Sequence, residues 1–315
     1  MQVHRDLNRL PVFRRPVVTI GSFDGVHLGH RALLRRIIAL AESVGGESVV
    51  VTFDPHPRHV LPSKRPDVKL LTDTLEKITR LEPLGIDHVV IVPFTLEFAA
   101  QTAKEYLTDF LLGRFSPHTV VIGYDHRFGT KRTGDIELLR SVASAKGVAV
   151  EEIAARDIDA IAVSSTRIRE SVTAGTIEEA NLMLGAPYEL NGLVVHGDAI
   201  GRTIGFPTAN LALRDAHKLI PCDGVYAVRA SAATSADRIV DRPAMLYIGR
   251  RPSLAGLRAR SIEINILDFD GDLYGSSMRV ELVAHIREDA QFDGLDALRA
   301  QLERDRESTR SMLAE

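Results

Sequence analysis

The chain has 315 residues, enough for two domains that each bury a core of their own. Apolar residues make up 45% and charged residues 26%, as in an ordinary globular protein, and the formal net charge is −3. This balance argues against a nucleic-acid coat or a membrane-surface protein, which would usually carry a large basic excess. The single cysteine, Cys222, excludes an intramolecular disulfide, and no long apolar run indicates a signal peptide or transmembrane helix. We therefore expect a soluble cytoplasmic protein.

Short β-rich runs alternate with helical stretches through the first half of the chain. The runs are apolar and β-branched, as strands buried on both faces should be, and cover residues 17–20, 48–53, 88–94, 119–124 and 148–153. Apolar residues recur at helical spacing between Leu33 and Ala41, and a second helix is expected over residues 102–112. This order predicts an α/β domain with a Rossmann-like, parallel, doubly wound sheet. Such sheets bind ligands at the carboxyl ends of their strands.

The pattern changes after about residue 187. Glycine and proline interrupt short strand-like runs, and residues 261–266 alternate strictly between apolar and polar side chains. Strands at this spacing predict an antiparallel barrel, with Gly271 in a hairpin turn. A terminal helix would carry Leu295, Leu298 and Leu302 on one stripe. We place the boundary near Pro187, between domains of residues 1–186 and 187–315.

Residues 21–30, with the sequence GSFDGVHLGH, directly follow a predicted strand and open a predicted helix. The three glycines would let the backbone approach a polyphosphate, and the helix N-terminus supplies unpaired N–H donors. His27 and His30 lie one short turn apart. Nucleotidyl transfer needs such hydrogen-bonding groups around the charge that grows as pyrophosphate leaves. The alternatives are two surface histidines or a fragment of a metal site, for which we find no further ligand set.

Residues 164–169, SSTRIR, form a second candidate anion site ahead of a helical segment. Hydroxyls and arginines at a helix start bind anions, although alone the stretch is more often a capping sequence with exposed arginines. Its presence beside the first motif favours the phosphate site.

The most specific segment is residues 197–210, GDAIGRTIGFPTAN. Its glycines predict tight turns and close backbone approach to a ligand. Thr208 and Asn210 lie two apart, so in an extended segment they project to one side. Their oxygens suit Mg²⁺ that bridges ATP phosphates. No Walker A sequence is present, so this is not a P-loop kinase, and the alternative is a glycine-rich barrel loop.

With these motifs in place, the chain resembles the bacterial bifunctional riboflavin kinase/FMN adenylyltransferases, or FAD synthetases, within the nucleotidylyltransferase superfamily. Further matching blocks are residues 52–58 (TFDPHPR), 123–129 (GYDHRFG), 221–226 (PCDGVY) and 248–253 (IGRRPS). Mild departures from the family pattern are Ser22, His126, Ser253 and Gln291.

The resemblance implies roles for residues of the first half. The ATP phosphates of the adenylyl transfer would be held by Gly21, Phe23, Asp24, Gly25, His27, His30, Ser165, Thr166 and Arg169. Asp125 and Phe128 would contact the flavin, and His27 and His30 would be catalytic.

It also implies roles for residues of the second half. ATP in the kinase site would be bound by Gly197, Gly201, Arg202, Gly205, Thr208 and Asn210, with Mg²⁺ on Thr208 and Asn210. Glu263 would be the general base that takes the proton of the riboflavin 5′-hydroxyl. The alternation of residues 261–266 alone would instead favour a solvent-facing carboxylate. Arg287 and Phe292 would belong to a flap over the flavin.

The leading hypothesis is two reactions on one chain that both need Mg²⁺ and ATP. The second domain would convert riboflavin to FMN, and the first would convert FMN to FAD with release of pyrophosphate. Two alternatives are an enzyme that keeps one activity and a catalytically silent flavin or nucleotide sensor. Intact His27, His30, Thr208, Asn210 and Glu263 argue against both. We expect small-molecule partners, no nucleic-acid or membrane partner, and a monomer or weak homo-oligomer.

Overall fold

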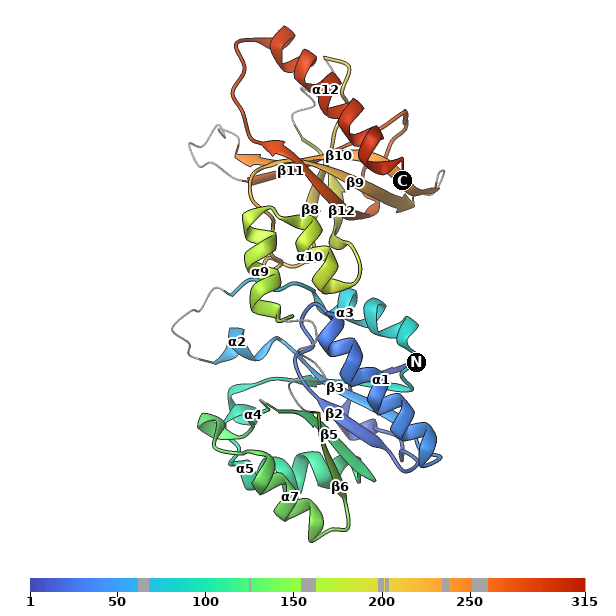
Figure 1. Ribbon diagram of the computed structural model, residues 1–315, viewed down its shortest axis with the longest axis vertical. Helices are drawn as coiled ribbons and strands as arrows, with labels where there is room; N and C mark the ends of the chain where they lie inside the picture. The colour runs from blue at the N-terminus through green and yellow to red at the C-terminus, as the bar shows by residue number, and fades with distance from the viewer. Residues whose placement is uncertain are drawn as a thin grey trace. The chain divides into compact units, whose positions relative to one another are not determined.

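The computed structural model describes residues 1–61, 68–124, 126–153, 163–197, 201, 204–233, 238–250 and 260–314. The chain divides into two compact units, Met1–Ser165 and Thr166–Glu315 (Figure 1). The first is α/β and the second is a barrel with a terminal helix, as predicted. This division lies two helices before Pro187, so that nearly all of α9 (Ser165–Ala174) and all of α10 (Ile177–Leu184) belong to the second unit.

The first unit is built on a parallel six-stranded sheet in the order β1-β4-β3-β2-β5-β6. Its strands are β1 (Gln2–His4), β2 (Val17–Ile20), β3 (Ser48–Asp54), β4 (His88–Pro93), β5 (Thr119–Gly123) and β6 (Ala149–Ile153). The five predicted strands are present within one residue at each end, and β1 is an edge strand that we did not predict. Because the strand order reverses between β2 and β5, the loops that follow these two strands border one crevice.

Helices cover both faces of this sheet (Figure 1). They are α1 (Leu28–Ser43), α2 (Pro57–Val60), α3 (Thr74–Leu81), α4 (Leu96–Ala100), α5 (Ala103–Glu105), α6 (Leu112–Phe115) and α7 (Ile136–Ser144), with short turns η1 (Leu7–Arg9), η2 (Glu82–Leu84), η3 (Tyr106–Leu111) and η4 (Thr130–Arg132). The predicted helix over residues 102–112 is the continuous run of α5, η3 and α6, of which η3 is a π-helix.

Two hydrophobic clusters form the core of the first unit, one on each face of the sheet. Val18 on β2 packs with Leu107 and Leu139, from η3 and α7. Val17, the preceding residue, packs on the opposite face with Leu34 of α1. Successive strand residues point to opposite faces, so a strand buried on both sides must be apolar throughout. The sheet is therefore a fixed platform for the loops at its carboxyl edge.

The second unit contains a closed antiparallel barrel in the order β10-β11-β8-β7-β12-β9. Its strands are β7 (Tyr188–Val195), β8 (Ala209–Leu213), β9 (Gly224–Ala233), β10 (Arg238–Arg250), β11 (Arg260–Ile266) and β12 (Ser277–Glu288). The predicted hairpin at Gly271 is wrong, because β8 and β7 lie between β11 and β12 in the sheet. A local turn pattern predicts that the chain changes direction, but it does not predict which strands then pair with each other.

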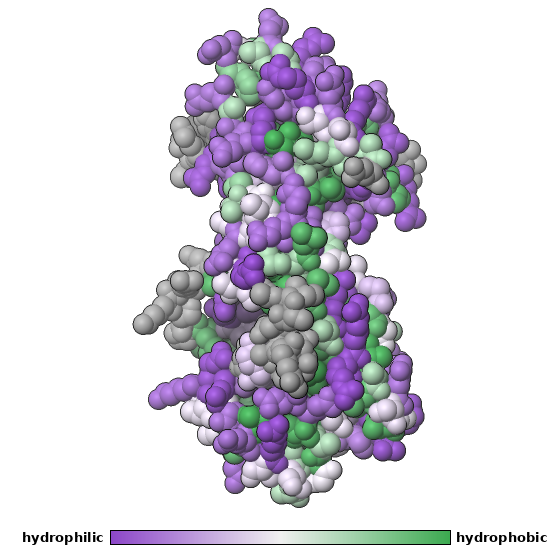
Figure 2. All heavy atoms as spheres, viewed as in Figure 1, coloured by the Kyte–Doolittle hydropathy of each residue, from purple (hydrophilic) through white to green (hydrophobic). Residues whose placement is uncertain are grey.

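The chain ends in α12 (Leu295–Leu313), which packs on the barrel. Leu302 contacts Phe206, Met245 and Leu267. Leu295, however, is 59% exposed, so the predicted stripe begins one turn later than expected. Hydrophilic residues dominate the visible surface around this helix (Figure 2). Among the described residues, no helix combines the length and apolar character that a bilayer crossing requires.

Candidate active sites

The loop between β2 and α1 is held in a conformation that most side chains avoid. Phe23, Gly25 and Val26 have positive φ angles of 47°, 86° and 43°. The side chains of Phe23 and Val26 are nevertheless buried. Strained backbone of this kind persists only where its surroundings fix it, and it is concentrated at functional sites. The burial of these two side chains therefore fixes the backbone of the loop after β2.

Asp24 fixes the same loop through its carboxylate. Its Oδ1 accepts hydrogen bonds from the N–H groups of Leu71 and Thr72, both at 3.0 Å. The N–H of Gly25 donates to the Thr72 hydroxyl at 3.0 Å. The Asp24 side chain is buried, so these bonds replace its contact with water. Its carboxylate thus ties the loop to residues 71–72.

His27 and His30 lie together at the start of α1, with ring centroids 3.6 Å apart and planes 17° from parallel. His27 is the N-cap, and its Nδ1 accepts from the His30 N–H at 3.3 Å. An accepting Nδ1 leaves the proton of neutral His27 on Nε2. Burial, His27 and Lys77 hold the pKa of His30 well below its ordinary value. His30 is therefore held as a neutral, hydrogen-bonding group at the positive end of the helix.

The two predicted phosphate motifs meet in the first unit, although 141 residues separate them in sequence. The Ser165 hydroxyl donates to the carbonyl oxygen of Asp24 at 3.1 Å. Thr166 and Arg169 follow on α9, in the second unit. At the other end of the loop, Gly21 faces the Phe23 ring, which would lie 3.2 Å from an added Cβ.

The predicted flavin residues of this unit differ in their surroundings. Asp125 lies outside the described residues. Phe128 is buried in the core cluster beneath the sheet and stacks on Tyr106, with centroids 5.2 Å apart. A Cβ at Gly134 would lie 2.3 Å from the Phe128 ring. The packing of Phe128 therefore shapes the loop after β5.

In the second unit, the loop before β8 uses its glycines to bring chain segments together. A Cβ at Gly197 would lie 2.1 Å from Asn210 Nδ2, and one at Gly201 would lie 2.2 Å from the Phe206 carbonyl oxygen. Gly205 has a φ of 84°. Arg202, also predicted to bind ATP, lies outside the described residues. The glycines thus permit both the close approach and the turn that the motif predicts.

Glu263, Thr208 and Asn210 are brought together by the pairing of β8 and β11. Glu263 and Asn210 are partners in the strand register, and the Thr208 hydroxyl donates to Glu263 Oε2 at 3.3 Å. Glu263 is only 3% exposed, so it is not the solvent-facing carboxylate that alternation alone would favour. A buried carboxylate beside two oxygen-bearing side chains can take a proton or help to bind a cation.

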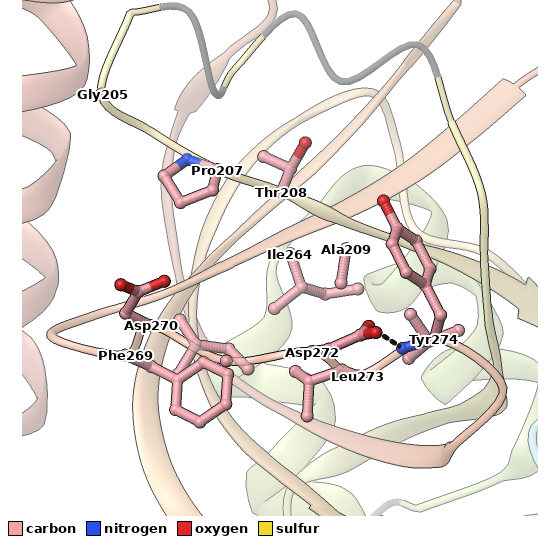
Figure 3. Close-up of a pocket in the computed structure, with 13 residues that line it drawn as sticks. Gly205, Pro207, Thr208, Ala209, Ile264, Phe269, Asp270, Asp272, Leu273 and Tyr274 are labelled. Atoms are coloured by element: carbon pink, nitrogen blue, oxygen red, sulfur yellow. Dashed lines mark hydrogen bonds between the residues drawn. The ribbon is translucent and has the colours of Figure 1, made fainter.

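A cavity of about 870 Å³ opens beside Thr208 (Figure 3). Its walls are the segment around Pro207 and Thr208, the side chains of Ile264 and Ile266, and residues 269–274. Tyr274 stacks on His196, with ring centroids 3.8 Å apart. The segment around Gly271, expected to be a hairpin turn, is therefore a wall of this cavity. Its size suits a nucleotide-sized ligand.

Arg287 and Phe292 contact each other at the base of α12. The guanidinium of Arg287 lies 5.5 Å from the Phe292 ring centroid. It also makes a two-pronged ion pair with the buried carboxylate of Asp305, with Nη2 to Oδ2 at 2.8 Å. Such a pair fixes the guanidinium plane.

Four residues of these sites were not singled out in the sequence analysis. Lys77 and Arg80 of α3 are buried, and Lys77 bonds to Thr52, the first residue of the block 52–58. Tyr274 and Asp305 are the other two. A signal for Lys77 is present in the sequence: it lies one turn from Leu81, on the side of α3 that should be apolar.

These features define the class of protein. A glycine-containing loop at the switch point of a parallel sheet, and a barrel with a Thr–Asn–Glu cluster beside a cavity, are arrangements suited to nucleotide-dependent transferases. The family model described as FAD synthetase matches residues 11–167, and the one described as riboflavin kinase matches residues 184–313. The chain therefore belongs to the bifunctional riboflavin kinase/FMN adenylyltransferase family.

Relatives named as bifunctional riboflavin kinase/FMN adenylyltransferases match almost the whole chain. The protein from Listeria monocytogenes is 38% identical over 95% of this chain and 92% of its own length. The one from Escherichia coli K12 is 37% identical over 92% and 90%. A crystal structure described as a macrolide-efflux protein from Streptococcus pneumoniae has a TM-score of 0.85 and 32% identity, and the match covers 98% of both chains.

Proposed function

We propose where the two activities of this bifunctional riboflavin kinase and FMN adenylyltransferase lie. Adenylyl transfer takes place at the carboxyl ends of β2 and β5, and riboflavin phosphorylation takes place around Thr208 and Glu263. The observation that carries the proposal is the hydrogen bond from the Thr208 hydroxyl to Glu263 Oε2. It joins the two kinase motifs, 55 residues apart, at one buried point beside a cavity.

In the adenylyl transfer, an FMN phosphate oxygen attacks the α-phosphorus of ATP and pyrophosphate leaves. The N–H groups at the start of α1 and the Nε2–H of His27 donate to the oxygens on which negative charge grows. Asp24 holds the loop in register through its bonds to residues 71–72. Ser165 bonds to the loop through the Asp24 carbonyl oxygen, and Thr166 and Arg169 remain proposed phosphate contacts on the resemblance alone.

In the kinase reaction, Glu263 accepts the proton of the riboflavin 5′-hydroxyl as its oxygen attacks the γ-phosphate. Burial of Glu263 keeps competing water away from the carboxylate. Thr208 and Asn210 offer hard, neutral oxygens of the kind Mg²⁺ prefers, and these residues would hold it. When bound, the ion neutralises charge on the transferred phosphate. Among the described residues, no cluster of three His, Cys, Asp or Glu side chains could hold a metal.

The cavity beside Thr208 is the proposed nucleotide pocket of the kinase. Its walls supply apolar contacts from Ile264 and Ile266 and an aromatic face from Tyr274 (Figure 3). Such a lining suits a purine ring next to a phosphate site. Arg287 and Phe292 remain the proposed flavin contacts, with Asp305 fixing the guanidinium.

Some wider assignments rest on the sequence. Residues 1–186 and 187–315 are the proposed functional domains, because residues 164–169 belong to the phosphate motif of the first. α10 is nevertheless hydrogen-bonded to the barrel, because the Asn181 amide donates to the Leu282 carbonyl oxygen at 2.9 Å.

The remaining proposals concern the whole protein. They are a cytoplasmic location, a monomer or weak homo-oligomer, and small-molecule partners alone.

The direct test is to incubate the protein with riboflavin and Mg-ATP and to separate the flavins by chromatography. FMN should form first and FAD should follow, with ADP and pyrophosphate as the other products. Appearance of FMN without FAD, even when FMN is supplied, would contradict the bifunctional proposal.

Paired variants then assign each activity to its site. Glu263→Gln should lower FMN formation by about 10²- to 10⁴-fold, the range of a general base, and leave FAD formation from supplied FMN unchanged. Replacement of both His27 and His30 by Ala should do the reverse. The exposed Glu307 provides a control, and Glu307→Gln should change neither rate. Loss of both activities in either site variant would contradict two independent sites.

A further inference from the structure

Helix α3 buries its charged face and exposes an apolar residue. Glu76, Lys77 and Arg80 are 4%, 4% and 7% exposed, whereas Leu75 on the same helix is 48% exposed. An amphipathic helix normally does the opposite, and charged side chains are seldom fully buried unless they have partners. Burial of a lysine costs free energy that must be offset by local contacts. The orientation of α3 therefore requires a reason specific to this site.

The contacts of Lys77 lead to the loop before α1. Its Nζ donates to Thr52 Oγ1 at 3.2 Å. The Thr52 hydroxyl then donates to the carbonyl oxygen of Ser22 at 3.2 Å. Thr52 lies on β3, next to β2 in the sheet, so the chain of two bonds crosses from α3 under the sheet edge to the loop. Lys77 thus fixes the direction of one carbonyl group in the phosphate loop.

The charge of Lys77 also acts on the histidine pair. Burial lowers the pKa of Lys77, while Asp24, Asp54 and Asp73 act in the opposite direction and favour its cationic form. The groups that act on His30 are His27 from its own helix and Lys77 from α3, and both lower its pKa. A cation behind His30 therefore favours the neutral imidazole.

We propose that Lys77 is a positioning residue for adenylyl transfer, which orients the Ser22 carbonyl through Thr52 and places its charge near His30. This role rests on the proposed assignment of the adenylyl site to the loop before α1. Because Lys77 is almost fully buried, it acts through Thr52 and His30. The Ser22 carbonyl is held by the Thr52 hydroxyl, and because a peptide unit is planar this bond also fixes the direction of the Phe23 N–H.

The test compares Lys77→Met, which removes the charge but keeps most of the chain length, with Lys77→Arg, which keeps the charge. The control is Lys146→Met, the same change at an exposed residue just before the edge strand β6. Lys77→Met should lower kcat for FAD formation from FMN about 100-fold, as expected when reacting groups are misplaced by about 1 Å. Riboflavin phosphorylation by the same sample should be unchanged, and circular dichroism should show the wild-type fold.

The pH profile separates this role from a purely structural one. Without the cation, the pKa of His30 should rise, so the acid limb of the adenylylation profile should move to higher pH in Lys77→Met. It should stay in place in Lys77→Arg. A lower rate in Lys77→Met with an unmoved acid limb would overturn the electrostatic part of the proposal.

Thr52→Val tests the other branch, because valine keeps the shape and removes the hydroxyl. If the two bonds act as one chain, the double variant with Lys77→Met should lose no more kcat than Lys77→Met alone. If the double variant instead loses kcat by the product of the two single losses, Lys77 does not act through Thr52. If Lys77→Met adenylylates FMN at the wild-type rate while the His27 and His30 variant does not, the proposed role of Lys77 is wrong and the site assignment stands. Retention of adenylylation in the histidine variant would instead reject the site assignment.

Discussion

The loop before α1 and the loop before β8 both carry glycines at a proposed phosphate site, but the glycines meet different demands. In the first loop, Gly25 lies in a run of positive φ angles with Phe23 and Val26. In the second, Gly197 leaves the space that the Asn210 side chain fills. The first loop thus needs glycine for a backbone conformation with positive φ, and the second needs glycine because a side chain would occupy the space of Asn210. Substitution should therefore affect stability at Gly25 and the position of a functional side chain at Gly197.

The largest effect expected from this comparison is that of Gly197→Ala. Its Cβ would lie 2.1 Å from Asn210 Nδ2, so the Asn210 side chain must move. Because Asn210 is a proposed Mg²⁺ ligand, FMN formation should fall about 100-fold. Steady-state kinetics of both activities on one sample provide the measurement. FAD formation from supplied FMN is the internal control, and an unchanged kinase rate would contradict the steric argument.

Much of this architecture could be predicted from the sequence because it depends on local patterns. Buried strands of the parallel sheet are apolar throughout, so their positions are evident from short β-branched runs. The proximity of His27 and His30 could be predicted because residues three apart at a helix start lie on one side, whereas the stacking of their rings could not.

Other features depend on packing between distant segments and could not be predicted. The turn at Gly271 is visible in the sequence, but the insertion of β8 and β7 between β11 and β12 is not. Lys77 lies on the side of α3 that should be apolar, but its bond to Thr52 and the burial of Arg80 depend on how this helix packs against the sheet. The Asp24 carboxylate accepts hydrogen bonds from residues 71–72, a contact that its position in the phosphate motif does not reveal. Each case depends on which distant segment packs against the residue, and the local sequence does not specify that segment.

A smaller effect is expected for Gly25→Ala, and Gly85→Ala is its matched control. The two glycines have nearly the same φ, 86° and 85°, and Gly85 has nothing within 4 Å of an added Cβ. Both variants should lose about 1–2 kcal/mol of unfolding free energy, the cost of a left-handed conformation for a non-glycine residue. Urea unfolding of the full chain measures this loss. Only Gly25→Ala should also slow FAD formation, and equal rates in the two variants would argue against a functional role of the loop.

The smallest effect is a pH dependence confined to the first unit. Because the pKa of folded His30 lies well below its ordinary value of 6.5, the unfolded chain binds a proton there more readily than the folded chain. The stabilisation is complete above pH 6.5 and is lost as the pH falls from there toward the folded pKa, by at most about 1.4 kcal/mol per pH unit. Urea unfolding at a series of pH values should show this slope for the wild type and a shallower one for His30→Gln. Equal slopes would mean that the fold does not hold His30 neutral, and the assignment of His30 as a neutral hydrogen-bonding group would then be wrong.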